Sequence, residues 1–427
     1  MIRILEYGQV LESEIFARTV PTVNVEAVVS EIIDKVKKEG DTALKFYCEK
    51  FDGAVLESLE VSKEEFDEAI ALMDEDFLRI IKDAAENIRR FHQMQKREGF
   101  QLEGANGEIV GQRILPVDKA GLYVPGGTAA YPSTVLMDSI PAKIAGVEEI
   151  VMVTPPGKNG KVAAPILAAA KIAGVDRVFK VGGAQAVAAL AYGTESIPKV
   201  DKIVGPGNAF VAEAKKQVFG QVSIDMIAGP SEILVIADAT CSAKAVAADL
   251  LSQAEHDKMA SAVLITDSLE LAKAVSEELE IQIPLLPRSE IARESIDNNG
   301  KIIVSENLEQ GIEIANALAP EHLELCLDRP FDYLDKIRHA GSVFMGKSCP
   351  EALGDYYAGP NHTLPTSGTA RFSSPLSVDD FLKKTQFIYY TEKALSLVAE
   401  DVATFARKEG LEAHARSALS RLEREGK

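Results

Sequence analysis

Basic residues, cysteines and long apolar runs are all scarce in this sequence. Its 427 residues include 46 Lys and Arg against 65 Asp and Glu, which gives a formal net charge of −19 at pH 7. Nucleic acids and anionic membranes are bound through an excess of Lys and Arg, so the acidity argues against either as a partner. It leaves room for a metal ion or a small anion held in a local pocket.

The four cysteines are too few for a disulfide framework in a chain of this length. They stand far apart, at Cys48, Cys241, Cys326 and Cys349. Since no two of them form a Cys-x-x-Cys pair, we expect reduced thiols and a cytoplasmic protein. The first residues lack the apolar region of a signal peptide. The longest uncharged stretch, residues 120–137, is broken by glycines and prolines, so we expect no membrane span.

Both ends of the chain have the periodicity of helices. Apolar residues recur at helical spacing over residues 25–51, with charged residues on the other face. A second helix is predicted from Ser62, which forms a capping-box pattern with Glu65, towards Phe91. From Leu376 to the end the pattern is again helical and charged, which we interpret as a tail that packs on another chain.

The middle of the chain has the pattern of α/β domains. From Gly121 onward, short apolar runs alternate with Gly/Pro-rich turns and Ala-rich segments, which predicts βαβ units and a parallel sheet. The pattern resumes around Ile233. Because 427 residues are more than one core normally uses, we expect at least two domains.

Glycine-rich corners follow the predicted strands at residues 124–127, 181–185 and 204–208. Backbone N–H groups at such corners can approach a phosphate. None of the corners contains the Gly-x-Gly-x-x-Gly fingerprint or the Gly-x-x-x-x-Gly-Lys-Ser/Thr phosphate loop. Tight turns are therefore the simpler interpretation on spacing alone, although ligands favour the carboxyl ends of the strands in sheets of this class.

The sequence has only six histidines, and two of them have ordinary surroundings. His92 is interpreted as a solvated residue on a charged helix, and His339 as a packing or capping residue. Gln253 and His256 lie three residues apart on a predicted helix, so both side chains leave from one face. They could form half of a metal site, although Gln is an uncommon ligand.

The other histidines have polar neighbours. Glu321 and His322 follow a proline and offer two proton-transfer groups at one place; a helix-start Glu beside a surface His is the alternative. Asp355 and His362 lie in an irregular polar loop, which is typical of functional sites and equally of solvated turns. His414 lies in the helical tail, where a surface position is the default.

Together and in this order, these segments resemble the histidinol dehydrogenase family over essentially the whole chain. The first motifs are Gly-Leu-Tyr-Val-Pro-Gly-Gly from Gly121, Val-Gly-Gly-Ala-Gln-Ala from Val181, Gly-Pro-Gly-Asn from Gly205 and Ala-Gly-Pro-Ser-Glu from Ala228. The later motifs are Ser-Gln-Ala-Glu-His from Ser252, Ala-Pro-Glu-His-Leu-Glu from Ala319, Ala-Gly-Ser-Val-Phe from Ala340, the Gly354–His362 loop, and Glu409 with His414.

The resemblance implies a zinc- and NAD-dependent oxidoreductase. Its reaction oxidises L-histidinol through L-histidinal to L-histidine, the last step of histidine biosynthesis. One zinc per subunit is implied, with ligands Gln253, His256, Asp355 and His414. Glu321 and His322 correspond to the acid/base pair. The implied substrate-binding residues are Ser231, Gln253, His256, His322, Asp355, His362, Glu409 and His414, and the implied NAD contacts are Tyr123, Gln185 and Asn208.

The resemblance also implies an architecture and an assembly. The expected fold is α/β, with two incomplete Rossmann-like domains and additional small helical domains. We place an N-terminal segment at 1–20, a first α/β domain with the zinc and acid/base residues at 21–120 and 238–375, and a second, NAD-side α/β domain at 121–237. The helical tail at 376–427 is expected to complete the partner's site in a homodimer with shared active sites.

Rival interpretations differ in the chemistry that they assign. Cys349, which precedes the Asp355 loop, could be a thiohemiacetal nucleophile as in aldehyde dehydrogenases, and full turnover of Cys349→Ala would exclude it. A family member acting on another small alcohol with the same zinc and NAD is the closer alternative. A non-catalytic metal-binding α/β protein would leave Glu321 and His322 unexplained.

Overall fold

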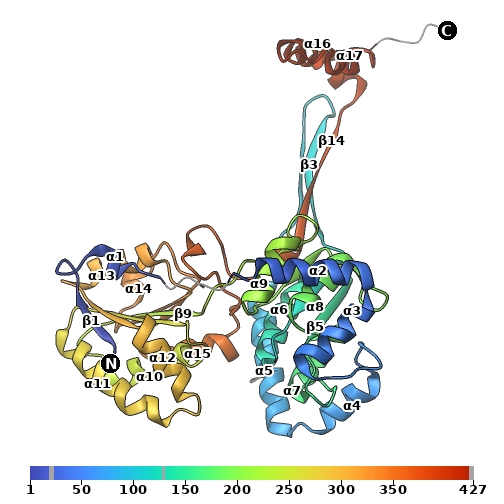
Figure 1. The fold of residues 1–427 in the computed structure, drawn as a ribbon. Helices are drawn as coiled ribbons and strands as arrows, with labels where there is room; N and C mark the ends of the chain where they lie inside the picture. The colour runs from blue at the N-terminus through green and yellow to red at the C-terminus, as the bar shows by residue number, and fades with distance from the viewer. Residues whose placement is uncertain (19–23, 127–129, 423–427) are drawn as a thin grey trace. The chain divides into compact units, whose positions relative to one another are not determined.

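The chain has a mixed α/β fold, as the sequence predicted. The computed structural model describes residues 1–18, 24–126 and 130–422. It divides into two compact units (Figure 1). The first comprises Met1–Gln95 and Val117–Phe381, and the second comprises Lys96–Pro116 and Leu382–Lys427. None of the described helices combines the length and apolar character needed to cross a bilayer.

The first unit contains a six-stranded sheet in which every neighbouring pair is parallel. Its order is β1 (Arg3–Glu6), β11 (Lys301–Val304), β10 (Ser261–Thr266), β9 (Glu232–Ala237), β12 (His322–Cys326) and β13 (Ser342–Met345). The strands are nearly continuous apolar runs because both faces of the sheet are covered. One face carries α10 (Ala243–Ala254), α11 (Leu269–Gln282) and α12 (Ser289–Asn299), and the other carries α13 (Leu308–Leu318).

A second parallel sheet, of five strands, lies in the same unit. Its order is β6 (Arg177–Lys180), β5 (Glu149–Thr154), β4 (Lys119–Tyr123), β7 (Lys202–Val204) and β8 (Ser223–Ile224). Helices α6 (Pro132–Ala145) and α7 (Ala164–Ala173) cover one face, and α8 (Gly183–Tyr192) and α9 (Ala209–Val218) cover the other. The Ala-rich segments read from the sequence form α7 and α8, which confirms the predicted βαβ pattern.

The N-terminal helices are α2 (Glu26–Glu39), α3 (Asp41–Tyr47), the turn η1 (Cys48–Asp52), α4 (Lys63–Ala71) and α5 (Glu75–Gln93). The predicted capping box is present: Ser62 Oγ accepts from the Glu65 amide, and Glu65 accepts from the Ser62 amide at 2.8 Å. The single helix expected towards Phe91 is instead two helices, because Asp74 caps a new start. His92, expected to be solvated, is buried, and its Nδ1 donates to the Ile88 carbonyl at 2.9 Å.

The grouping of these elements differs from the expected domain boundaries. Residues 21–120 were placed with 238–375, but α2 to α5 pack against α6, α7 and α8 of the five-stranded sheet (Figure 1). Strand β1, expected in a separate segment 1–20, is an edge strand of the six-stranded sheet, and β9, expected in 121–237, is central to it. Helices α2 to α5 bury their apolar faces against helices of the five-stranded sheet. The periodicity of a sequence predicts that such a face is buried, but it does not predict which element covers it.

The second unit combines an antiparallel sheet with two helices. Strand β14 (Leu382–Tyr389) pairs with β3 (Ile109–Pro116), which pairs with β2 (Phe100–Glu103). Helices α16 (Glu392–Lys408) and α17 (Glu412–Leu419) follow. The expectation of a helical chain from Leu376 onward is therefore wrong over β14, whose Thr, Phe, Ile and Tyr residues favour a strand once a partner is present.

Short elements connect the rest of the described chain. They are α1 (Glu12–Ile15), η2 (Ile283–Leu285), α14 (Phe331–Leu334), α15 (Glu351–Leu353), η3 (Gly354–Ala358), η4 (Thr369–Arg371) and η5 (Val378–Phe381). Two of them matter for the site: α15 and η3 run without a break and carry polar side chains back to the amino edge of the six-stranded sheet.

Candidate active site

The acid/base pair expected at Glu321 and His322 lies where β12 begins. In the register of the neighbouring strand, His322 faces Ile233, so both residues lie beside Glu232 at the start of β9. The Glu232 amide donates to Glu321 Oε2 at 2.8 Å, and the Glu232 carbonyl lies 3.0 Å from His322 Nδ1. A carbonyl only accepts, so Nδ1 carries a proton and the Nε2 lone pair of the neutral ring is left for chemistry.

Burial and neighbouring charges shift both pKa values. Burial raises the pKa of Glu321 to about 8, against the lowering effect of His322. Burial lowers the pKa of His322, but Glu321 and Asp355 outweigh it and raise the value to about 10. His322 Nε2 has no hydrogen-bond partner among the described residues. It lies 3.5 Å from Asp355 Oδ1 and 3.8 Å from Glu351 Oε1.

His322, Glu351 and Asp355 form a cluster whose ligand atoms lie within 4.8 Å of one another. Glu351 is not among the residues predicted from the sequence. A signal was present: Glu351 and Asp355 are four residues apart, the spacing that puts two side chains on one face of a helical turn. They lie on the continuous segment formed by α15 and η3.

Glu351 also orients a predicted metal ligand. Gln253, in the last turn of α10, donates from Nε2 to Glu351 Oε1, and Ser252 Oγ donates to Glu351 Oε2 at 2.7 Å. Because Nε2 is committed to Glu351, a cation ligand supplied by Gln253 would be its amide oxygen.

The remaining predicted ligands of the first unit have the protonation states that a metal needs. Burial lowers the pKa of His256, which favours the neutral imidazole. Burial raises the pKa of Asp355, but His322 and His362 hold it well below its usual range, so Asp355 is a carboxylate. The charge of Asp355 acts on His256, so the two face the same space.

The structure brings His322, Glu351 and Asp355 close enough together to hold a metal ion, and His256 is not part of that group. By atom type, the predicted ligands Gln253, His256 and Asp355 offer the oxygen and nitrogen donors that zinc accepts. Without a cation, the acids around His322 hold its pKa at about 10, which would keep the ring protonated. A divalent cation beside Asp355 would offset that negative charge and free the His322 Nε2 lone pair.

His362 and its two neighbours join the cluster to the five-stranded sheet. His362 Nδ1 donates to the Asp355 carbonyl at 3.1 Å, and its Nε2 lies 3.3 Å from Thr134 Oγ1 on α6. Asn361 Nδ2 donates to the Met137 carbonyl at 2.6 Å, and Thr363 Oγ1 donates to Asp138 at 2.8 Å. Three successive residues are therefore bonded to one helix of the other sheet.

The predicted substrate residue Ser231 directly precedes Glu232. Its carbonyl accepts from the Ser261 amide at 2.9 Å, which fixes the chain where β9 begins. Ser231 is therefore adjacent in the chain to Glu232, whose backbone bonds Glu321 and His322; its role as a substrate contact stays a prediction.

The predicted NAD residues lie at the carboxyl ends of the five-stranded sheet. Tyr123 ends β4, Gln185 is in the first turn of α8 after β6, and Asn208 caps α9 after β7. Strand β5 lies on one side of β4 in the sheet, and β7, which comes later in the chain, lies on its other side. The topological switch point, where sheets of this class bind nucleotides, is therefore between β4 and β7.

The corner between β7 and α9 is shaped for close backbone approach. Gly205 has φ +115°, and a Cβ there would lie 2.1 Å from the Tyr123 carbonyl oxygen, so only glycine fits. Tyr123 Oη accepts from the Gly183 amide at 3.0 Å, and burial raises its pKa to about 12. At the N-terminus of α9, the Asn208 side chain likewise accepts from the amides of Phe210 and Val211. Gly127, in the first predicted corner, lies outside the described residues.

Glu409 and His414 lie in the second unit. Glu409 is the residue that ends α16, and His414 is in α17; both are exposed in the single chain. Cys349, the rival nucleophile, lines a cavity of about 100 Å³ together with Asp355 and His362.

Fold and site together define a class: an α/β protein with two parallel sheets, a buried Glu–His pair, a carboxylate–histidine cluster that could hold a cation, and a topological switch point of the kind where nucleotides bind. The chain belongs to the histidinol dehydrogenase family, whose family model matches residues 17–422.

Relatives with that name support the assignment. A histidinol dehydrogenase from Bacillus cereus is 57% identical over 401 residues, which cover 94% of this chain and 93% of the relative. One from Geobacillus kaustophilus is 56% identical over 396 residues, with 93% of each chain covered. The crystal structure of histidinol dehydrogenase from Elizabethkingia anophelis is 39% identical, with a TM-score of 0.93 over 99% of this chain and 98% of that one.

Proposed function

We propose that the protein catalyses the NAD-dependent oxidation of L-histidinol through L-histidinal to L-histidine, the last step of histidine biosynthesis. The observation that carries this proposal is the buried Glu321–His322 pair, held by the backbone N–H and C=O of Glu232 in β9, with His322 in a cluster that could hold a metal ion. The names of the relatives disfavour the alternative of another small alcohol as substrate. The acidic chain and its free cysteines are consistent with a cytoplasmic enzyme.

The proposed site combines both sheets. Gln253, His256 and Asp355, with the partner's tail, would hold zinc, which would supply a Lewis acid to position and polarise the substrate's imidazole and amine. Tyr123, Gln185 and Asn208 would contact NAD, which would supply the hydride acceptor for each of the two oxidations in turn.

The chain's own residues move the protons. His322 Nε2 accepts the hydroxyl proton as hydride leaves the carbinol carbon. Glu321 then takes a proton from the water that adds to the aldehyde, since a carboxyl group with a pKa of about 8 is poised near the operating pH. After His322 has released the first proton to solvent, its Nε2 deprotonates the resulting hydrate for the second hydride transfer. Ser231 and His362 contact the substrate from the two sides of the cluster.

The stoichiometry of NADH tests the proposed reaction. With L-histidinol as substrate, two NADH are expected for each substrate consumed, because the alcohol and the aldehyde are both oxidised. The absorbance of NADH and the amount of L-histidine formed are measured in the same reaction. A ratio of one would indicate a simple alcohol dehydrogenase, and no NADH would exclude the proposal.

A shared dimer site predicts complementation between inactive chains. We propose that His414 and Glu409 act in the site of a partner subunit, because both are exposed on a unit whose helix α16 leaves Leu397 60% and Phe405 70% exposed in the single chain. Mixing His414→Asn chains with His322→Gln chains is expected to restore up to about a quarter of the wild-type activity, since random pairing gives half heterodimers, each with one intact site. No recovery after subunit exchange, verified by tagged copurification, would mean that each chain supplies its own His414.

A further inference from the structure

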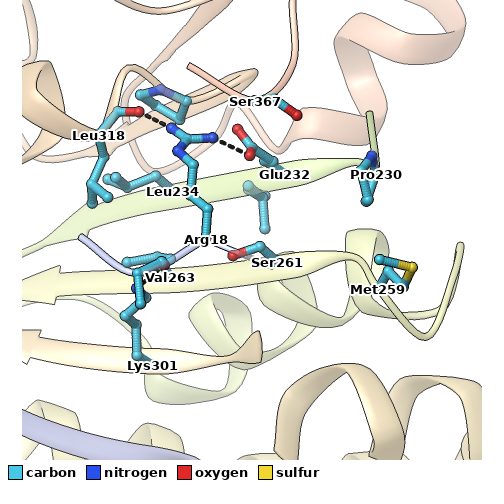
Figure 2. Close-up of a pocket in the computed structure, with 13 residues that line it drawn as sticks. Arg18, Pro230, Glu232, Leu234, Met259, Ser261, Val263, Lys301, Leu318 and Ser367 are labelled. Atoms are coloured by element: carbon cyan, nitrogen blue, oxygen red, sulfur yellow. Dashed lines mark hydrogen bonds and ion pairs between the residues drawn. The ribbon is translucent and has the colours of Figure 1, made fainter. Parts of the chain in front are cut away.

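Arg18 links two segments next to the proposed acid/base pair: the start of β9 and the end of α13. It lies near the N-terminus, on the wall of a cavity of about 250 Å³ at the amino ends of β9, β10 and β11 (Figure 2). Its guanidinium donates from Nη1 to the Glu232 carboxylate and from Nη2 to the Leu318 carbonyl. Figure 2 shows both interactions as dashed lines that converge on the one side chain.

Each of the two acceptors leads directly to the pair. Glu232 is the residue whose amide bonds Glu321 and whose carbonyl bonds His322. Leu318 is the last residue of α13, only three residues before Glu321, and the corner between them contains Ala319 in a left-handed conformation, with φ 48°. The Arg18 guanidinium therefore bonds to the start of β9, which holds Glu321 and His322 through hydrogen bonds. It also bonds to the end of α13, directly before the turn that leads to these two residues.

The link has the properties of a rigid one. The Arg18 side chain is 28% exposed and the Glu232 side chain 14%, so solvent screens their ion pair less than at an open surface. A guanidinium is planar and can serve two acceptors at once, which an ammonium on a flexible stem does not do with the same geometry. Lys301 donates to the carbonyls of Ile15 at 2.7 Å and Ala17 at 2.9 Å and so holds the chain that precedes Arg18.

We infer that Arg18 is a positioning residue for Glu321 and His322, acting through the Glu232 backbone and the Leu318 corner. It touches neither substrate nor cofactor in the proposed site. The inference rests on the proposed function, because it assumes that Glu321 and His322 carry the proton transfers.

The test separates kcat from KM and from metal content. For Arg18→Met we expect kcat with L-histidinol to fall about 10- to 100-fold, because displacements of about 1 Å at reacting groups cost that much. The KM for L-histidinol and the zinc bound per chain should stay unchanged, since the zinc ligands lie on other segments. Arg18→Lys keeps the positive charge but lacks the planar guanidinium that serves two acceptors. Its kcat should lie between those of Arg18→Met and the wild type.

Matched variants distinguish positioning from general destabilisation. Arg293 makes a two-pronged pair with Glu280 between α11 and α12, so Arg293→Met removes a similar interaction elsewhere and should keep full kcat. Arg18→Ala should regain part of its kcat when millimolar guanidinium chloride is added, and none with the same concentration of sodium chloride. In the Arg18→Met background, a further Glu232→Gln change should cost little, because its partner is already gone.

Opposite results would overturn the inference. A wild-type kcat for Arg18→Met, a loss confined to KM or zinc content, or a full additional loss from Glu232→Gln would each do so. His322→Gln is assayed in parallel: if that variant is active, the proposed function itself fails. If His322→Gln is inactive while Arg18→Met turns over normally, only the role of Arg18 is wrong.

Discussion

His322→Gln is expected to lower kcat for L-histidinol oxidation by about 10²- to 10⁴-fold, the contribution of a positioned general base. Glutamine preserves the approximate length and polarity of the side chain but accepts no proton in this range. The effect should be large because His322 acts in both hydride-transfer steps of the proposed reaction. The rate of NADH formation at saturating NAD and substrate measures it, and zinc content per chain shows whether the cluster is still intact.

Two neighbouring residues provide the controls for this variant. His339→Gln changes a half-buried histidine in the same region, whose backbone amide donates to Asn316, and should leave kcat within about two-fold of the wild type, as surface changes away from a site usually do. Cys349→Ala tests the thiol rival, since Cys349 lines the cavity beside Asp355 and His362. A His322→Gln enzyme with wild-type turnover, or an inactive Cys349→Ala enzyme with normal zinc, would contradict the assignment of the base.

Removal of the metal is expected to have an effect of similar size. Dialysis against a strong chelator should lower turnover by at least about 10²-fold, because a Lewis acid contributes several kcal/mol to such a step. Zinc added in stoichiometric amounts should restore it. Elemental analysis should give one zinc per chain before treatment and after restoration. Unchanged turnover in a sample shown to be free of metal would exclude the proposed role of zinc.

Substitution of a proposed zinc ligand tests the metal site without a chelator. Asp355→Asn should retain less zinc after gel filtration, since the carboxylate is the charged ligand of the set. Asp328→Asn is the matched control, because Asp328 is an exposed carboxylate whose side chain is 72% accessible and which pairs with Lys347. Equal zinc retention by the two variants would place the metal elsewhere.

The sequence predicted the elements of the fold better than their grouping. The βαβ pattern was correct because small residues, β-branched runs and Gly/Pro turns encode it locally. Helices α2 to α5 were assigned to the wrong sheet. An amphipathic pattern predicts that one face of a helix is buried, but it does not predict which element that face packs against. Strand β14 was missed because its partner β3 is distant in the sequence, and strand formation depends on such pairing.

The candidate site was only partly predictable for a similar reason. The general rule places ligands at the carboxyl ends of parallel strands, and the predicted NAD residues follow it. Glu321 and His322 lie instead at the amino edge of their sheet, where α10 returns with Gln253. No local pattern marks that edge. Glu351 was overlooked because its function depends on Gln253, almost a hundred residues earlier, and His92 because the Asn361 side chain that donates to it is equally remote.

The bonds that tie Asn361, His362 and Thr363 to α6 limit how the enzyme can move during turnover. Helix α6 packs with β4, the strand that ends at Tyr123. Any tilt of the cofactor-side sheet must therefore carry His362 with it and pull on the Asp355 carbonyl. If the five-stranded sheet moved to let one NAD replace another, the His362 and Asp355 contacts at the proposed substrate site would be disturbed. They would be kept only if the motion were confined to loops outside this link. A stiff connection of this kind therefore favours cofactor exchange by movement of loops rather than by tilting of the sheet.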